Sequence, residues 1–262
     1  MNHHVKIAAV LILAAFAGGC AGFRDISLFS TQEEIELGMG VAQQVESEMK
    51  LLDDPQVVGY VRTVGSRVAA HAERQDIEYV FNVVDAPDQI NAFAIPGGWV
   101  YIFTGLLKQM QTEAELAAVL AHEVAHIAER HSMEQLTRQF GFNLVLSAVL
   151  GEEAAAWQAI LAQASSGLVM LRFSRDDERQ ADELGVQYMY AAGYNPEGMV
   201  HLLELFLSMQ EREPSKVEQW LSTHPISSER IRLVKEQIEE QDLQTTGTVE
   251  RQAYQNMIRR LR

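Results

Sequence analysis

The motif H-E-x-x-H at residues 122–126 constrains this chain more than any other feature. The surrounding segment has a helical pattern, with a capping-box spacing at Thr112 and Glu115 and apolar residues at helical intervals after it. Because positions i and i+4 of an α-helix lie on one face, His122 and His126 can bind one metal ion. Glu123 can then reach a water molecule on that metal.

Two ordinary core histidines are the alternative explanation of this motif. Alanine fills most gaps between the apolar residues of the segment, so we expect the motif to be buried. Burying two histidines and a glutamate in such surroundings is costly unless they are paired or bind a metal. We therefore favour the metal site.

Residues 1–19 have the pattern of a signal peptide, because a positive residue precedes an apolar run that is too short to span a bilayer. The next residues resemble a bacterial lipobox, although Ala17 stands where that motif usually has leucine. Cys20 is the only cysteine. We predict lipidation of Cys20, a tether over residues 20–30, and anchoring to the outer membrane on the periplasmic side, since Ala21 fits that sorting pattern. The alternative is an ordinary cleaved signal with an incidental thiol.

The composition allows one full hydrophobic core. The chain has 262 residues, of which 47% are hydrophobic, and no Gly/Ser/Pro-rich linker or internal repeat divides it. We expect one domain over residues 31–240 and a polar, peripheral C-terminal tail over residues 241–262. The formal net charge of −15 makes nucleic acid and anionic lipid surfaces poor partners.

The pattern before the motif changes from helix to strand. Helices are expected over residues 31–52 and 55–74. Residues 77–83 alternate between apolar and polar, which indicates a half-buried strand, and further strands are expected over residues 91–95 and 99–103. The predicted fold class is α+β, a mainly α-helical zincin-type domain with a small β-sheet before the H-E-x-x-H helix.

The strand that contains Asn91, Ala92, Phe93 and Ala94 has two interpretations. As an exposed edge, it would pair with an extended peptide substrate through main-chain hydrogen bonds. As part of a plain meander, it would be structural only. Residue spacing does not separate the two.

Glu178 is the predicted third metal ligand, because two histidines and one glutamate form an established catalytic zinc set. A helix start at Ser174 precedes it, and Asp182 one turn later would accept the outer N–H of a ligand histidine. Two alternatives stay open. In the first, these acidic residues only stabilise the start of the helix through its dipole. In the second, Glu152 or Glu153 is the third ligand instead.

Two further segments carry structural expectations. Residues 140–171 are apolar and alanine-rich, which predicts two core helices. His131 is expected near the end of the motif helix, where the helix dipole favours a positively charged imidazole.

Together these motifs resemble those of a known family. The H-E-x-x-H motif is followed by S-R-x-x-E-x-x-A-D at residues 174–182 and by Thr223-His224-Pro225 with Glu229-Arg230. The stretch from Asn91 to Gly98 resembles the family's edge strand and turn. Over residues 30–240 the chain is similar to the CAAX prenyl endopeptidases and HtpX-type heat-shock proteases, which are gluzincin zinc metallopeptidases.

This resemblance implies one Zn2+ per chain, bound by His122, His126 and Glu178. The chain departs from the membrane-embedded members in lacking transmembrane helices, and from the BepA type in having no room for a C-terminal tetratricopeptide array. It is similar to short periplasmic lipoproteins of the LoiP type. That similarity implies protein quality control, with unfolded or misassembled envelope proteins as substrates.

His224 and Arg230 are the remaining candidate residues. His224, held extended by the following proline, would donate to the developing oxyanion or, as the BepA type implies, close the zinc as an inhibitory fourth ligand. A loop histidine with a structural bond is the third explanation. Arg230 would pair with a site carboxylate such as Asp182.

The expected reaction is peptide-bond hydrolysis, with Glu123 moving a proton from water to the leaving amine. One alternative is a zinc-containing periplasmic chaperone or binding lipoprotein without proteolysis, whose function would survive Glu123→Gln. The other is a metal-dependent hydrolase of a non-peptide bond, with a closed pocket in place of an edge-strand groove. The intact motif favours the peptidase.

Overall fold

A computed structural model describes residues 29–139 and 172–261 of the chain. The predicted signal peptide, Cys20 and most of the tether lie outside the described residues. So do the two core helices predicted over residues 140–171, and with them Glu152 and Glu153.

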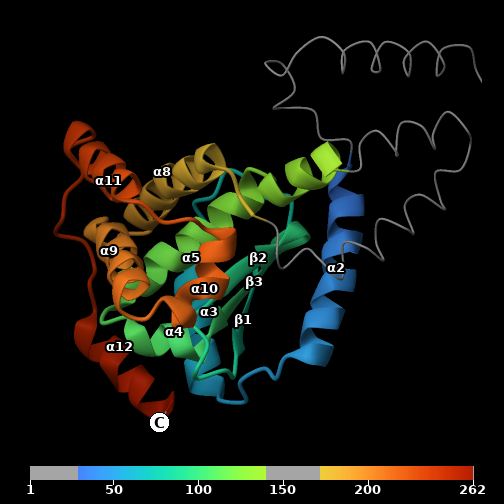
Figure 1. The fold of residues 1–262 in the computed structure, drawn as a ribbon, viewed down its shortest axis with the longest axis horizontal. Coiled ribbons are helices and arrows are strands. Elements are labelled where there is room, and N and C mark those ends of the chain that lie inside the picture. Colours follow the sequence, from blue (N-terminus) through green and yellow to red (C-terminus); the bar gives the residue numbers. More distant parts are fainter. Residues whose placement is uncertain (1–28, 140–171, 262) are drawn as a thin grey trace, which may run out of the picture.

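The described strands all lie in the first half of the chain, between helices (Figure 1). The α-helices that lie wholly within the described residues are Thr31–Glu48 (α2), Pro55–Ala69 (α3), Thr104–Gln109 (α4), Glu113–Ala128 (α5), Arg175–Ala191 (α8), Glu197–Arg212 (α9), Pro214–Thr223 (α10), Ser228–Glu240 (α11) and Arg251–Ile258 (α12), and residues 131–139 are also helical. The strands are Val80–Val84 (β1), Ala92–Ile95 (β2) and Trp99–Phe103 (β3), with 3-10 turns at Pro96–Gly98 (η1) and Arg259–Leu261 (η3). The predicted α+β class is confirmed.

Helix starts follow their sequence signals more closely than helix ends do. Ser30 caps α2 through a full capping box, and Asp54 caps α3 ahead of Pro55. The predicted end of α2 near residue 52 is wrong. Leu51 forms a bridge to Val84, and the amide of Leu52 donates to the main chain of β1, so these apolar residues extend along the sheet.

The three strands form one sheet in the order β1-β3-β2, with β1 parallel and β2 antiparallel to β3. Among the described residues β2 is therefore an edge strand. The expectation that β1 is half-buried is wrong, because the sheet has a core on each face. Phe81 and Val83 face the α3–α5 side, and Val84 packs in the cluster that includes α2. Figure 1 shows α2 on one side of the sheet and α3 with α5 on the other.

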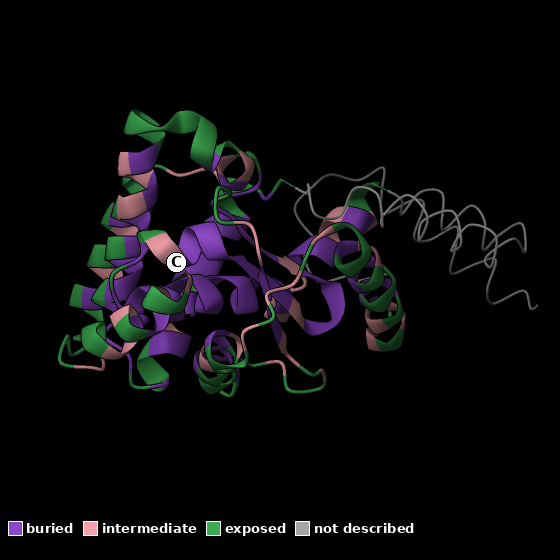
Figure 2. Ribbon diagram, turned by 90° about the horizontal axis from the view of Figure 1, so that it is seen from below, coloured by how far each residue is buried: buried purple, intermediate pink, exposed green. Residues whose placement is uncertain are grey.

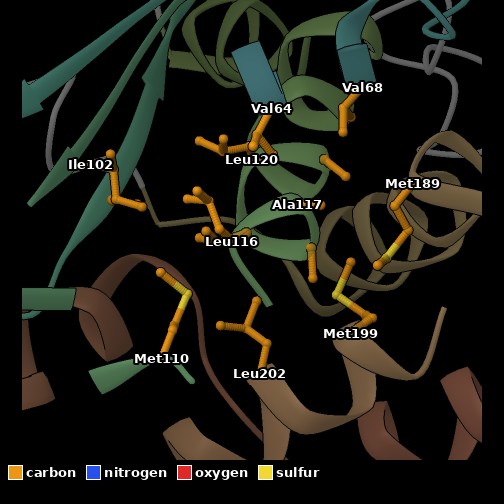
Figure 3. Close-up of a cluster of buried hydrophobic side chains, with 14 of the residues drawn as sticks. Val64, Val68, Ile102, Met110, Leu116, Ala117, Leu120, Met189, Met199 and Leu202 are labelled. Carbon is orange, nitrogen blue, oxygen red and sulfur yellow. The ribbon is translucent and has the colours of Figure 1, made fainter. Parts of the chain in front are cut away.

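Helix α5 is the centre of the larger core. Every residue from Glu113 to Ile127 is buried, and Figure 2 shows this buried centre within more exposed helices. In Figure 3, Leu116, Ala117 and Leu120 of α5 lie among side chains of the sheet and three other helices. The labelled neighbours are Val64, Val68, Ile102, Met110, Met189, Met199 and Leu202. The motif helix is thus enclosed by protein.

The C-terminal segment packs against the domain, which corrects the expectation of a peripheral tail. Tyr254 of α12 is fully buried, and its hydroxyl donates to the carbonyl of Leu107 over 2.7 Å. The carbonyl of Val249 accepts from the amide of Glu113 at the start of α5. Two buried side chains, Tyr254 and Met257, anchor this otherwise polar segment. None of the described helices is both long and apolar enough to cross a membrane.

Candidate metal centre

Helix α5 presents the motif residues to one point. His122 and His126 are each 1% exposed, and Glu123 is fully buried. The Nε2 atoms of the two histidines lie 3.1 Å apart. The helix is fixed at its start by Thr112, whose hydroxyl accepts from the amide of Glu115.

Helix α8 brings Glu178 to the same point. A capping box between Ser174 and Asp177 starts this helix, so the fully buried Glu178 lies in its first turn. Its Oε1 lies 3.5 Å from His126 Nε2, and its Oε2 lies 3.6 Å from His122 Nε2.

His224 completes the cluster from the end of α10. Its Nδ1 lies 2.9 Å from Glu178 Oε1 and 3.4 Å from His122 Nε2. Trp220, one turn earlier in α10, stacks on the His224 ring with centroids 4.3 Å apart. The histidine is 1% exposed, so it is part of the buried site and not a loop residue in solvent.

These four residues fit a zinc ion. One potential ligand atom from each of His122, His126, Glu178 and His224 lies within 4.8 Å of all the others. Around a tetrahedral zinc with bonds of about 2.1 Å, ligand atoms are about 3.4 Å apart. The distances of 3.1, 3.5 and 3.6 Å among His122, His126 and Glu178 are close to this value. Nitrogen and carboxylate donors also match the preference of zinc.

Glu123 faces this cluster without a hydrogen bond of its own. Both of its carboxylate oxygens are buried and lack a hydrogen-bond partner among the described residues. Burial raises its pKa to about 7, and the Glu178 charge adds to this rise, whereas His122 and the backbone of Ala94 act in the opposite direction. A buried carboxyl group with a pKa near neutrality is suited to accept and release protons.

Asp182 and Arg230 lie behind the ligand atoms. Asp182 Oδ1 is 3.0 Å from His122 Nδ1, on the side of the ring away from the cluster. Arg230 donates to both Asp182 oxygens over 2.6 and 2.7 Å and to Glu178 Oε2 over 2.5 Å. Burial opposes ionisation of Asp182, but the charge and hydrogen bonds of Arg230 outweigh it, so the pKa of Asp182 is lowered.

His131 belongs to the site, which the sequence analysis did not foresee. Its Nδ1 lies 2.9 Å from His126 Nδ1, and it is 3% exposed. Burial lowers the pKa of His131, so the expectation of a charged imidazole at the helix end is wrong. Phe173 also stacks on His126, with centroids 3.9 Å apart. The short separation of His131 from the motif was the only sequence signal for its role.

The predicted substrate strand lies beside the motif helix. Asn91 is buried just before β2, and Ala92, Phe93 and Ala94 belong to β2 itself. Ala94 is the least buried of the three, and its backbone lowers the pKa of Glu123. The edge of the sheet is therefore close to the carboxylate that faces the cluster.

Comparison with known proteins gives the same family over most of the chain. The sequence pattern of peptidase family M48 matches residues 55–238. A beta-barrel assembly-enhancing protease of Yersinia pestis is 32% identical over 213 residues, covering 77% of this chain and 43% of the relative. Its Escherichia coli K12 counterpart is 31% identical, covering 78% of this chain and 44% of the relative.

A mitochondrial relative extends this comparison. The metalloendopeptidase OMA1 of Schizosaccharomyces pombe is 35% identical over 185 residues, covering 69% of this chain and 53% of the relative. The chain thus spans about half the length of these relatives, or less. The family match confirms the resemblance to zinc metallopeptidases. The chain belongs to peptidase family M48.

Proposed function

We propose that this chain is a zinc-dependent endopeptidase. The observation that carries the proposal is the convergence of four buried ligand side chains on one point, with the carboxylate of Glu123 facing them and forming no hydrogen bond among the described residues. A buried carboxylate without a hydrogen bond is costly, and a role in proton transfer or in binding substrate would explain its presence.

His122, His126 and Glu178 would hold the zinc. When bound, zinc polarises the scissile carbonyl and lowers the pKa of water. Glu123 would take a proton from the attacking water and deliver it to the leaving amine. Asp182 would hold the ring of His122 in the orientation that presents Nε2, and Arg230 would hold Asp182 and Glu178 in place.

An extended segment of substrate would pair with β2. Support comes from the edge position of this strand among the described residues and from the nearness of Ala94 to Glu123. Main-chain pairing of Asn91–Ala94 with the substrate would place a peptide bond beside the general base with little dependence on side chains. Unfolded or misassembled proteins, which expose extended backbone, are the substrates we propose.

His224 has two roles that experiment can separate. Its Nδ1 lies among the other ligand atoms, which favours the role of a fourth ligand that closes the site. Its Nε2 lies 3.8 Å from Glu123 Oε1, which is the side from which it could instead donate to the oxyanion.

The test combines zinc analysis with cleavage of casein, with and without a chelator. Wild type is expected to bind about one zinc per chain and to cleave, and Glu123→Gln to keep the zinc but lose about 10²–10⁴-fold in rate. His224→Ala gains activity if His224 closes the site and loses activity if it is catalytic. Zinc binding without cleavage by any variant would refute the peptidase, and a chain without zinc would refute the metal site.

We also propose that Cys20 is lipidated and anchors the chain to the outer membrane on the periplasmic side. The lipobox-like sequence supports this, and relatives named for β-barrel assembly fit an envelope location. Membrane fractionation and the mass of the N-terminal peptide would be compared for wild type and Cys20→Ser. The proposal fails if both proteins fractionate alike and no lipid mass is found.

A further inference from the structure

A row of hydrogen bonds connects the metal centre to the protein surface behind His126. His126 Nδ1 contacts His131 Nδ1 over 2.9 Å, and His131 Nε2 contacts Gln180 Oε1 over 3.4 Å. The side-chain amide of Gln180 then donates to Glu129 Oε2. His126 and His131 are buried, Glu129 is half-buried and Gln180 is exposed, so the row runs from the site to solvent.

The direction of each hydrogen bond in this row follows from its outer end. A carboxylate accepts only, so Glu129 fixes the NH₂ of Gln180 toward itself and the amide oxygen toward His131. That oxygen also accepts only, so His131 carries its proton on Nε2. His131 Nδ1 lies within hydrogen-bond distance of His126 Nδ1 and can accept from it. It must accept if His126 is to keep Nε2 free for a metal, and His131 is then neutral.

The inner end requires the same direction. With its proton on Nδ1, His126 has a free lone pair on Nε2, the atom that faces His122 and Glu178. The opposite direction would place a proton on His126 Nε2 and block a metal bond. The carboxylate of Glu129 at the surface and the metal site therefore both favour the tautomer of His126 that is protonated at Nδ1.

We infer that His131 is a positioning residue for His126, and that Gln180 and Glu129 fix its tautomer from the surface. This inference rests on the proposed zinc site. The two ligand histidines then differ in the group that contacts their Nδ1 atoms. This group is the carboxylate of Asp182 for His122 and a neutral imidazole for His126. A neutral partner adds no charge to a site that already contains the carboxylates of Glu178 and Asp182.

The experiment measures zinc affinity by competition with a chromophoric chelator. His131→Leu is expected to weaken zinc binding about 10–100-fold, the range found for partners of metal-ligating histidines. His131→Asn places an oxygen near the position of Nδ1 and should recover part of this loss. His201→Leu, at an exposed histidine of α9, is the matched control and should bind zinc like wild type.

Imidazole nitrogen NMR of the zinc-loaded protein gives the second readout. We expect His126 to be protonated at Nδ1 in wild type. Gln180→Leu, at an exposed position, should keep the fold and lose less zinc affinity than His131→Leu. It replaces His131→Leu as the test of the inference if that variant does not fold. The inference is overturned if Nδ1 of His126 is unprotonated. It is also overturned if His131→Leu folds and binds zinc like wild type. If His131→Leu does not fold, wild-type zinc binding by Gln180→Leu overturns it. If wild type does not cleave casein, although the Nδ1 proton of His126 and the expected differences in zinc affinity are found, only the proposed function is contradicted.

Discussion

The buried carboxylate of Glu34 joins three parts of the fold, and its removal should measure how strongly they are held. Glu34 is 1% exposed and pairs with Arg74 and Arg130, each over 2.8 Å. It also accepts from the amide of Gly97 in the turn after β2. Arg74 in turn contacts the carbonyl of Ile127 near the end of α5. Glu34→Gln keeps the shape of the side chain, removes its charge and replaces one acceptor oxygen with an NH₂ donor.

The expected cost follows from the exposure of the two arginines. Loss of one partner from a buried ion pair costs about 3–5 kcal/mol of unfolding free energy. The side chains of Arg74 and Arg130 are 10% and 24% exposed, and each keeps another partner, Asp76 and the carbonyl of Phe29. The lower end of the range therefore applies, about 3 kcal/mol. For a chain of this size, that corresponds to a fall in Tm of about 6–12 °C.

Urea unfolding followed by circular dichroism, at fixed zinc concentration, measures this cost. Glu36→Gln is the matched control, because Glu36 lies on the same helix, is exposed and accepts a hydrogen bond from Gln32 one turn earlier. It should change the unfolding free energy by no more than about 0.5 kcal/mol. If Glu34→Gln costs no more than Glu36→Gln, the buried ion pairs do not stabilise the fold and this reasoning is wrong.

Three further predictions concern the site and the packing of α2. In zinc-free protein the pKa of Glu123 is raised to about 7 from an ordinary 4.5. This rise should lower the free energy of unfolding by about 3 kcal/mol above pH 7 and leave it unchanged below pH 4.5. Glu123→Gln should therefore be the more stable protein in urea at about pH 8 but not at about pH 4, and equal stability at both would contradict this. Asp182→Asn should weaken zinc binding about 10–100-fold in chelator competition, and unchanged affinity would show that Asp182 does not orient His122. Gly38→Ala should lower the unfolding free energy in urea by about 1–3 kcal/mol, because the new Cβ would lie 1.9 Å from a backbone oxygen. Gly40→Ala, where a Cβ meets open space, should raise it by about 0.5–1 kcal/mol. Similar effects of the two substitutions would contradict the close packing at Gly38.

Sequence signals predicted the parts of this fold that depend on a few neighbouring residues. The starts of α2, α3, α5 and α8 follow caps and prolines, and β3 occupies the predicted residues 99–103. Where tertiary contacts decide the outcome, the predictions fail. Leu51 and Leu52 fit a continuing helix but pair with β1. The polar C-terminal segment gives little sign that Tyr254 is a buried anchor.

The same distinction holds within the metal centre. Local helix geometry is enough to place His122, Glu123 and His126 on one face, and to put Glu178 and Asp182 one turn apart on another helix. That the two helices meet at these residues is a property of packing, which the spacing alone does not contain. The same is true of His224, which reaches the cluster from a third element.

The contact of His131 with His126 shows most clearly what neighbouring residues alone do not predict. On an unbroken helix His131 would lie five residues after His126, about 140° around the axis, and its ring would point away. The helix instead breaks at Arg130, whose φ of 56° lies in the left-handed region. This conformation is costly for a residue with a side chain, and the ion pair with Glu34 and the hydrogen bond to Phe29 oppose the cost. A carboxylate on α2 thus helps to hold the turn that brings His131 to His126, so this contact depends on residues nearly a hundred positions apart.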